Sequence, residues 1–392
     1  MIKSTETVAA APRLAGFSGV VCAFLVVAGA LFTSSMSRAQ DLPCDIVTSA
    51  APLSNEQKQA VQAYAEQFLA PLAGDDAVKV RDGRNGLVKP LQRCTPGVPF
   101  RQAYTKILDS ELKKLVEGNR TINAVNALRV ASEVATTEGF DIIEKGFASK
   151  DVAVRVAAAG AASHALEIAA KTPSIAVPKR LYDMNVALGK LAETDPDADV
   201  VDGATEALVQ SLKTATSPET RNAAVAALCK VARSQSQKIK TSVPESRTLF
   251  AILRTGLALR DELTIANAGN RSALPAEAVK SIAETAGDMI AMVARLLSAG
   301  ALPVIKSGDV TAVKRQKEDD RRVPTQIVGA AEQILSLIAD RTEPIRANLA
   351  EKVRAGSVQS DAQFVLDAKQ LLGPDGRLTR PPFSLPGNRF AL

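Results

Sequence analysis

Histidine, tryptophan and aromatic residues in general are scarce in this sequence. Its 392 residues include one histidine, no tryptophan and 4% aromatic residues, whereas 46% are hydrophobic. A single histidine, His164, cannot form a multi-histidine metal site or a facial triad, and no Cys-x-x-Cys pair offers a structural zinc site. We therefore predict no metal and no cofactor, and a core built from Ala, Leu, Val and Ile.

Phosphate-binding loops and sheet patterns are also missing. The sequence has no Gly-x-x-x-x-Gly-Lys-Ser/Thr loop and no strand that leads into a Gly-rich turn, so nucleotide binding has no support. No run of alternating apolar and polar residues indicates a sheet. A length of 392 residues exceeds the usual single compact core. One elongated all-α array resolves this difficulty, because it has no single core to outgrow.

The excess of positive charge is small. The formal net charge is +6, and removal of residues 1–39 would take away three basic residues and one acidic residue, leaving +4. Basic and acidic residues alternate, and no cluster of aromatic residues could stack on bases. We therefore predict no nucleic-acid partner.

A repeated pattern, Ala-x-x-Ala-Leu, is the main signal that the sequence does contain. Copies begin at residues 124, 162, 204 and 224, so their starts differ by 38, 42 and 20 residues. A weaker copy from Met184 divides the 42-residue interval, which makes the unit about 20 residues and the pair about 40. In each copy the apolar residues share one helical face, and small Ala side chains let neighbouring helices approach closely.

Two segments share a helix start and a helical face. Residues 149–161 and 217–227 each begin with a start signal, continue to an arginine, Arg155 or Arg221, and then carry alanines at helical spacing. In this respect the chain resembles the HEAT-repeat family, over about residues 119–234. The resemblance implies an all-α fold in which antiparallel helix pairs stack into a right-handed superhelix, an α-solenoid.

Arg155 and Arg221 are the candidate interaction residues, because they recur at equivalent helix starts. We favour a packing role over ligand binding. In that role the stem of each arginine lies on the neighbouring helix and its guanidinium pairs with an acidic residue.

Residues 1–39 have the features of a signal peptide. Basic residues precede the apolar run 14–32, and residues 37–39 have the small-x-small arrangement that predicts cleavage between Ala39 and Gln40. The alternative is an uncleaved anchor, since the apolar run is near the ~20 residues that span a bilayer. We expect an exported protein, periplasmic or secreted, or else one anchored in the inner membrane. Any membrane contact would be made by this N-terminal segment.

Three cysteines follow the predicted cleavage site. Cys44 and Cys94 lie in turn-rich segments outside the repeat pattern, and this usage is typical of an oxidising compartment. We predict a disulfide between them that staples an N-terminal segment, residues 40–100, and stabilises it by ~2–4 kcal/mol. Cys229 follows Leu228 inside a helix and is expected to be a buried apolar residue.

The remaining organisation follows from polar gaps and prolines. HEAT-like repeats are expected over 101–234 and an irregular helical continuation over 245–372, with a second helical domain as the alternative for the latter. The charged stretch 314–322 is assigned to a polar loop. The Pro-rich tail, residues 373–392, is expected to be disordered.

Two groups of acidic residues, within 195–199 and 318–320, are the candidates for acid–base chemistry on a sugar. We prefer structural interpretations for both. The first group forms a turn before a helix whose dipole favours acids, and the second belongs to a solvated loop. His164 lies inside a repeat copy and is expected to be a helix-surface or packing residue.

From these features we expect an exported, non-enzymatic helical-repeat scaffold that binds another protein of the cell envelope. Solenoids offer long surfaces for their length, but the packing residues do not specify the partner. One alternative is an extracytoplasmic enzyme that acts on an envelope polysaccharide. Another is a structural component that associates with itself end to end.

Overall fold

The computed structural model describes residues 41–172, 175–339, 345 and 348–390. All of these residues belong to one compact unit, Asp41–Leu392. The predicted signal peptide, residues 1–39, and its cleavage site between Ala39 and Gln40 lie outside the described residues.

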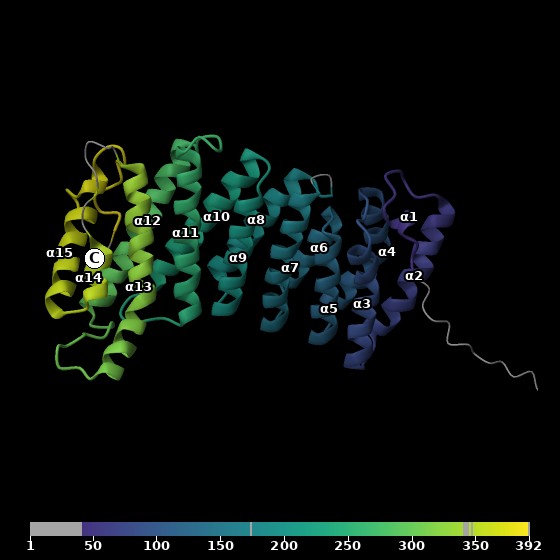
Figure 1. The fold of residues 1–392 in the computed structure, drawn as a ribbon, viewed down its shortest axis with the longest axis horizontal. Coiled ribbons are helices and arrows are strands. Elements are labelled where there is room, and N and C mark those ends of the chain that lie inside the picture. The colour runs from purple at the N-terminus through teal and green to yellow at the C-terminus, as the bar shows by residue number, and fades with distance from the viewer. Residues whose placement is uncertain (1–40, 173–174, 340–344, 346–347, 391–392) are drawn as a thin grey trace, which may run out of the picture. The chain divides into compact units, whose positions relative to one another are not determined.

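The described part of the chain contains helices and no strand, which confirms the all-α class (Figure 1). Neighbouring helices pack in pairs. The α-helices are α1 Cys44–Val47, α2 Asn55–Ala73, α3 Ala77–Arg93, α4 Val98–Val116, α5 Thr121–Val134, α6 Thr137–Phe147, α7 Val152–Lys171, α8 Pro178–Thr194, α9 Ala198–Thr214, α10 Pro218–Lys238, α11 Ser246–Asn267, α12 Ala276–Ser298, α13 Thr311–Ile338, α14 Leu349–Ala355 and α15 Val358–Leu372, followed by the 3-10 helix η1 Arg377–Thr379.

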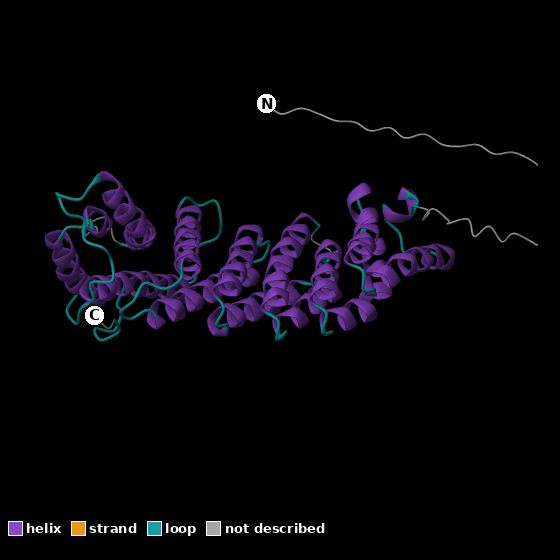
Figure 2. Ribbon diagram, turned by 90° about the horizontal axis from the view of Figure 1, so that it is seen from below, coloured by secondary structure: helices purple, strands orange, loops and turns teal. Residues whose placement is uncertain are grey.

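Within the compact unit, alternate helices pack on one another and form two layers (Figure 2). One layer contains α3, α5, α7, α9, α11 and α13, and each of these helices contacts the next member of the layer. The other layer contains α2, α4, α6, α8, α10, α12 and α15 in the same manner. Helices that are consecutive in the sequence therefore usually lie in opposite layers.

Helix starts follow the local signals in the sequence. Ser217 caps α10, because its hydroxyl oxygen accepts a hydrogen bond from the backbone N–H of Thr220, and Pro218 occupies the first helical position. At the start of α2, Ser54 and Gln57 form a reciprocal capping box. Such caps satisfy backbone N–H groups that have no partner within the helix.

The Ala-x-x-Ala-Leu residues form the centre of the packing between helices. The two alanines and the leucine that define the pattern are buried in all four full copies, with at most 8% of their surface exposed. Small residues bring the helices close: a side chain on Gly189 of α8 would place its Cβ 2.9 Å from the Cβ of Ala227 on α10. Any larger residue at Gly189 would therefore push these two helices apart.

Helix α13 corrects the prediction of a polar loop at 314–322. The helix begins at Thr311, includes this charged stretch and continues through Pro324. Side chains four residues apart support the helix, since Gln316 donates a hydrogen bond to Asp320 at 2.9 Å and Lys314 lies 4.0 Å from the carboxylate of Glu318. Pro324 ends no helix here, and its missing N–H leaves only one hydrogen bond unmade.

The C-terminal tail is also different from its prediction of disorder. Its described residues, 373–390, pack on the helices, and Phe383, Leu385 and Phe390 are buried. Arg389 donates a 2.6 Å hydrogen bond to the carboxylate of Asp288 on α12. Apolar side chains placed between the prolines give this segment enough surface to bury.

One hydrophobic core extends through the compact unit, from Leu42 to Phe390. Helix α4 begins at Val98 and crosses the expected boundary at residue 100 without a break. The helices of the expected continuation, 245–372, contribute to the same core as the repeats before them. The expected segments are therefore parts of one array.

Candidate functional site

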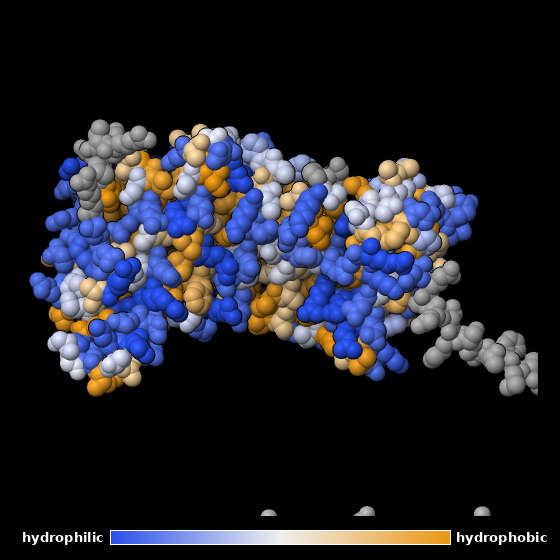
Figure 3. All heavy atoms as spheres, viewed as in Figure 1, coloured by the Kyte–Doolittle hydropathy of each residue, from blue (hydrophilic) through white to orange (hydrophobic). Residues whose placement is uncertain are grey.

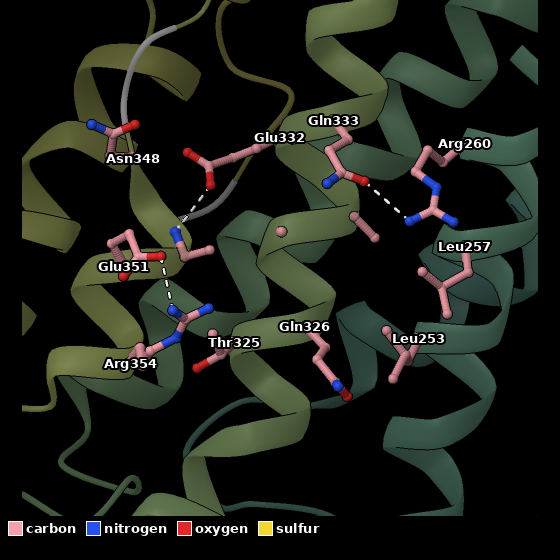
Figure 4. A pocket seen from close by; sticks show the side chains of 13 residues that line it. Leu253, Leu257, Arg260, Thr325, Gln326, Glu332, Gln333, Asn348, Glu351 and Arg354 are labelled. Carbon is pink, nitrogen blue, oxygen red and sulfur yellow. Dashed lines mark hydrogen bonds and ion pairs between the residues drawn. The ribbon is translucent and has the colours of Figure 1, made fainter. Parts of the chain in front are cut away.

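A cleft lies between α11, α13 and α14 (Figure 4). It encloses about 490 Å³. Helix α13 forms its floor, and α11 and α14 form its two sides. Elsewhere on the face seen in Figure 3, polar residues cover most of the surface and apolar residues appear in narrow strips between them.

The floor of the cleft has a polar side chain at each end and a glycine between them. Gln326, Gly329 and Gln333 follow one another along α13 at spacings of three and four residues, which places them on one helical face. Gly329 has no side chain, so the floor is lowest between the two glutamines. Primary amides both donate and accept hydrogen bonds, which lets Gln326 and Gln333 pair with a peptide backbone.

The side formed by α11 combines apolar and cationic residues. Leu253 and Leu257 are one helical turn apart, and Leu257 is 36% exposed at the cleft. Arg260 lies one turn further on and donates a 3.1 Å hydrogen bond to the side-chain oxygen of Gln333. A second hydrogen bond of 2.6 Å joins Arg260 to Asp261. The guanidinium is thus held in place by partners on two helices.

The side formed by α14 is fixed to the floor by Glu332. The carboxylate of Glu332 accepts hydrogen bonds from the backbone N–H groups of Leu349 at 2.5 Å and Ala350 at 3.0 Å. It thereby caps the first turn of α14, which has no cap from its own Asn348 side chain. Asn348 has a φ of 47°, a left-handed conformation that Asn tolerates better than most residues. This carboxylate therefore has a structural role.

Three other hollows occur in the described part of the chain. One of about 440 Å³ continues the cleft and shares Arg260, Glu332, Gln333 and Asn348 with it. Another, of about 620 Å³, lies at the loops before α5 and α7, and a third, of about 450 Å³, lies beside α10. Among these four hollows, we regard the cleft on α13 as the candidate site, because it combines an exposed leucine of α11 with two glutamine amides of α13.

Arg155 lies in a packing position away from this cleft. Its guanidinium forms two hydrogen bonds with Asp195, of 2.6 and 3.1 Å, and a third with the backbone oxygen of Ser149 at 3.0 Å. The hydrogen bonds with Asp195 raise the pKa of Arg155. These contacts join the start of α7 to the turn before α9.

Arg221 occupies the equivalent position on α10. It is 4% exposed and donates a 2.5 Å hydrogen bond to Glu262 of α11, which is 2% exposed. Arg271 also donates to Glu262, at 2.8 Å. Both candidate arginines thus have acidic partners in the next part of the array, as their packing interpretation predicts.

The acidic residues near position 195 serve as turn and cap residues. Asp197 accepts hydrogen bonds from the backbone N–H groups of Asp199 and Val200 and so caps α9. Glu318, Asp319 and Asp320 are exposed on α13, which places them on a helix instead of the expected loop.

His164 lies on the surface of α7, with Nε2 3.4 Å from the carboxylate of Glu133 on α5. The hydrogen bond with this carboxylate raises the pKa of His164. Among the described residues, no group of three or more His, Cys, Asp or Glu side chains could hold a metal ion.

The cysteines lie as predicted. A disulfide joins Cys44 and Cys94, whose Cα atoms are 5.8 Å apart, and such a bond fits an oxidising environment. Cys229 is a buried free thiol, and burial raises its pKa.

Helix α7 is the one described helix that is long and apolar enough to cross a membrane. It packs between α5 and α9 in its layer. Helix packing therefore also accounts for its alanine-rich composition.

Sequence reasoning did not find the cleft. Arg260 and Gln333, which meet across it, are 73 residues apart in the chain. No motif links them, and their contact depends on α11 and α13 being neighbours in one layer.

Comparison with known proteins adds little to this description. No protein-family model matches the chain, and no curated protein matches its sequence. A solved structure of an engineered protein is similar at 16% sequence identity over 76% of this chain and 97% of that chain, with a TM-score of 0.25. A likeness at this level carries no inference about the fold or the function.

Proposed function

We propose that this protein is an exported, non-enzymatic α-solenoid of the HEAT type that acts as a protein-binding scaffold in the cell envelope. In this proposal the helix pairs wind into a right-handed superhelix, and the cleft on α13 captures the partner. One observation carries the proposal: the amides of Gln326 and Gln333 lie beside Leu253 and Leu257 in a cleft that is bounded by three helices.

The cleft favours a peptide segment as the bound part of the partner. Apolar side chains of the segment would cover Leu257, and its backbone N–H and C=O groups would pair with the two glutamine amides. Because Arg354 is paired with Glu351 and Arg260 with Asp261, binding does not depend on net charge and should persist at moderate salt.

Two further features support the proposed location outside the cytosol and the proposed HEAT type of repeat. The disulfide between Cys44 and Cys94 favours a compartment outside the reducing cytosol. The pairs Arg155–Asp195 and Arg321–Asp361 each reach past one helix over 40 residues, which is close to the length of a HEAT helix pair.

The test is capture of a partner by residues 40–392 from the envelope fraction of the native cell, with crosslinking and mass spectrometry. The variant Leu257→Asp places a charge in the cleft and is expected to abolish capture, because the apolar contact is lost. The matched control is Val186→Asp, which changes an exposed aliphatic residue (53%) on α8, in the other layer and outside the cleft. Equal capture by both variants would refute the cleft as the binding surface.

A further inference from the structure

The first and last long helices of the array each expose an uncovered stripe. The stripe of α2 lies opposite its buried residues Val61 and Ala65, and that of α15 lies opposite Phe364 and Ala368. In each, the exposed residues recur at spacings of three and four, on one helical face. We call them the α2 stripe (Gln59, Ala63, Glu66, Gln67 and Ala70) and the α15 stripe (Gln359, Ala362, Leu366, Lys369 and Gln370).

Small residues and amides of the same kind join the helices inside the array. Gly189 of α8 packs directly on Ala227 of α10. Asn185 donates a hydrogen bond to the backbone oxygen of Thr220 at 3.1 Å. In the reverse direction, Gln235 of α10 donates to the backbone oxygen of Ala192 at 2.7 Å. The contact between α8 and α10, neighbours in one layer, is therefore held by small side chains and by amides that reach carbonyl groups across it.

The two stripes carry this chemistry without a neighbouring helix to use it. Ala63 and Ala362 are each the second residue of their stripes, and glutamines lie near both ends. Terminal repeats of solenoids normally present polar outer faces, yet Leu366 is 54% exposed. The charges are complementary, since the α2 stripe contains Glu66 and the α15 stripe contains Lys369.

We propose that the α15 stripe of one molecule packs on the α2 stripe of a second copy, so that molecules join head to tail. The layer that runs from α2 to α15 would then continue into the next molecule with the helix-on-helix contact that it uses internally. Because the two stripes differ, the interface is heterologous, and it leaves one free stripe at each end of a dimer. A contact of one helix on another is small, so association is weak and rises with concentration.

Sedimentation velocity of residues 40–392, which contain the whole compact unit, tests this proposal over a range of concentrations. The average sedimentation coefficient of the unmodified chain is expected to increase with concentration. Ala63→Arg blocks the α2 stripe and Ala362→Arg blocks the α15 stripe, and each variant alone is expected to stay monomeric. A mixture of the two retains one intact stripe of each kind and is expected to form a 1:1 dimer and nothing larger.

The controls distinguish this interface from non-specific association and from misfolding. Ala226→Arg changes an exposed alanine in the middle of the array, on α10, and should leave association unchanged. Circular dichroism melting verifies that each variant is folded. A monomer at every concentration, or association of Ala63→Arg by itself, would overturn the proposal. Neither stripe contributes to the cleft on α13, so the outcome is independent of partner capture.

Discussion

Arg321 and Asp361 are joined by two hydrogen bonds, of 2.9 and 2.6 Å, although 40 residues separate them in the sequence. Arg155 and Asp195 are also 40 residues apart, and Arg221 and Glu262 are 41 apart. Arg155 and Arg321 each reach past one intervening helix, whereas Arg221 of α10 reaches the last turns of the next helix, α11. These pairs join parts of the array at three places.

Loss of the acid at the last of these places should be costly. Arg321 is 1% exposed, so Asp361→Ala would leave a buried guanidinium without its counter-charge. We expect a loss of about 3–5 kcal/mol in the free energy of unfolding, measured by urea denaturation. In the control, Glu167→Ala removes the exposed partner of Lys171 and should cost less than about 1 kcal/mol. Equal losses for the two variants would contradict a special role for Arg321.

The disulfide between Cys44 and Cys94 should stabilise the start of the array. It closes a loop over a sequence separation of 50 residues, and its removal is expected to cost about 2–4 kcal/mol. The measurement compares the melting of the native chain, with and without reductant, with that of a double variant carrying Cys44→Ala and Cys94→Ala. The reductant should lower the stability of the native chain only. If it lowers the stability of both equally, the effect does not come from this bond.

His164 should titrate above its ordinary pKa of about 6.5, because the carboxylate of Glu133 favours the charged imidazole. Its interaction with Glu133 therefore contributes fully to stability below the unfolded pKa and is lost as pH rises through the folded pKa. As the only histidine in the sequence, it gives a single NMR titration curve. Glu133→Gln should lower the measured pKa, and an unchanged curve would show that this contact does not form.

Gly287 should be needed for docking of the C-terminal tail. A Cβ at this position would collide with the ring of Phe390, so Gly287→Ala is expected to release the segment 373–390 and expose it to proteases. Limited proteolysis followed by mass spectrometry would locate the new cleavage sites. Protection equal to that of the native chain would contradict the described position of Phe390.

Gly160→Ala provides the matched comparison for that substitution. Gly160 also lies within a helix, α7, but a Cβ there would meet nothing within 4 Å. Alanine should therefore raise the free energy of unfolding by about 0.5–1 kcal/mol, through its better helix propensity alone. A loss of stability in urea denaturation would mean that this face of α7 is already covered.

Local patterns in the sequence predicted much of the array. The Ala-x-x-Ala-Leu residues are buried because their spacing places them on one helical face. The pairing of Cys44 with Cys94 and of Arg155 with an acid followed from residue type, since two cysteines outside the repeats and a packed arginine each require a partner. Prediction was wrong where composition competed with tertiary contacts. The charges before Pro324 indicated a loop, but the buried contacts of Arg321 hold this segment as a helix.

The position of the tail and the existence of the cleft could not be predicted from local sequence patterns, because both depend on contacts between residues far apart in the chain. Prolines in residues 373–392 indicated disorder, whereas Phe390 finds a gap at Gly287, about a hundred residues earlier. The cleft depends on the contact between Arg260 and Gln333, across 73 residues. No periodic pattern in the sequence indicates either contact, so each contact depends on the arrangement of whole helices.

The regular span of the arginine–acid pairs has a consequence for how the chain folds. Because these contacts join segments about 40 residues apart, little loop entropy is lost when each forms, and low contact order favours rapid folding. Folding can begin at any helix pair and spread to its neighbours. When the chain emerges with its N-terminus first, one helix pair can therefore fold before the next helix pair has emerged.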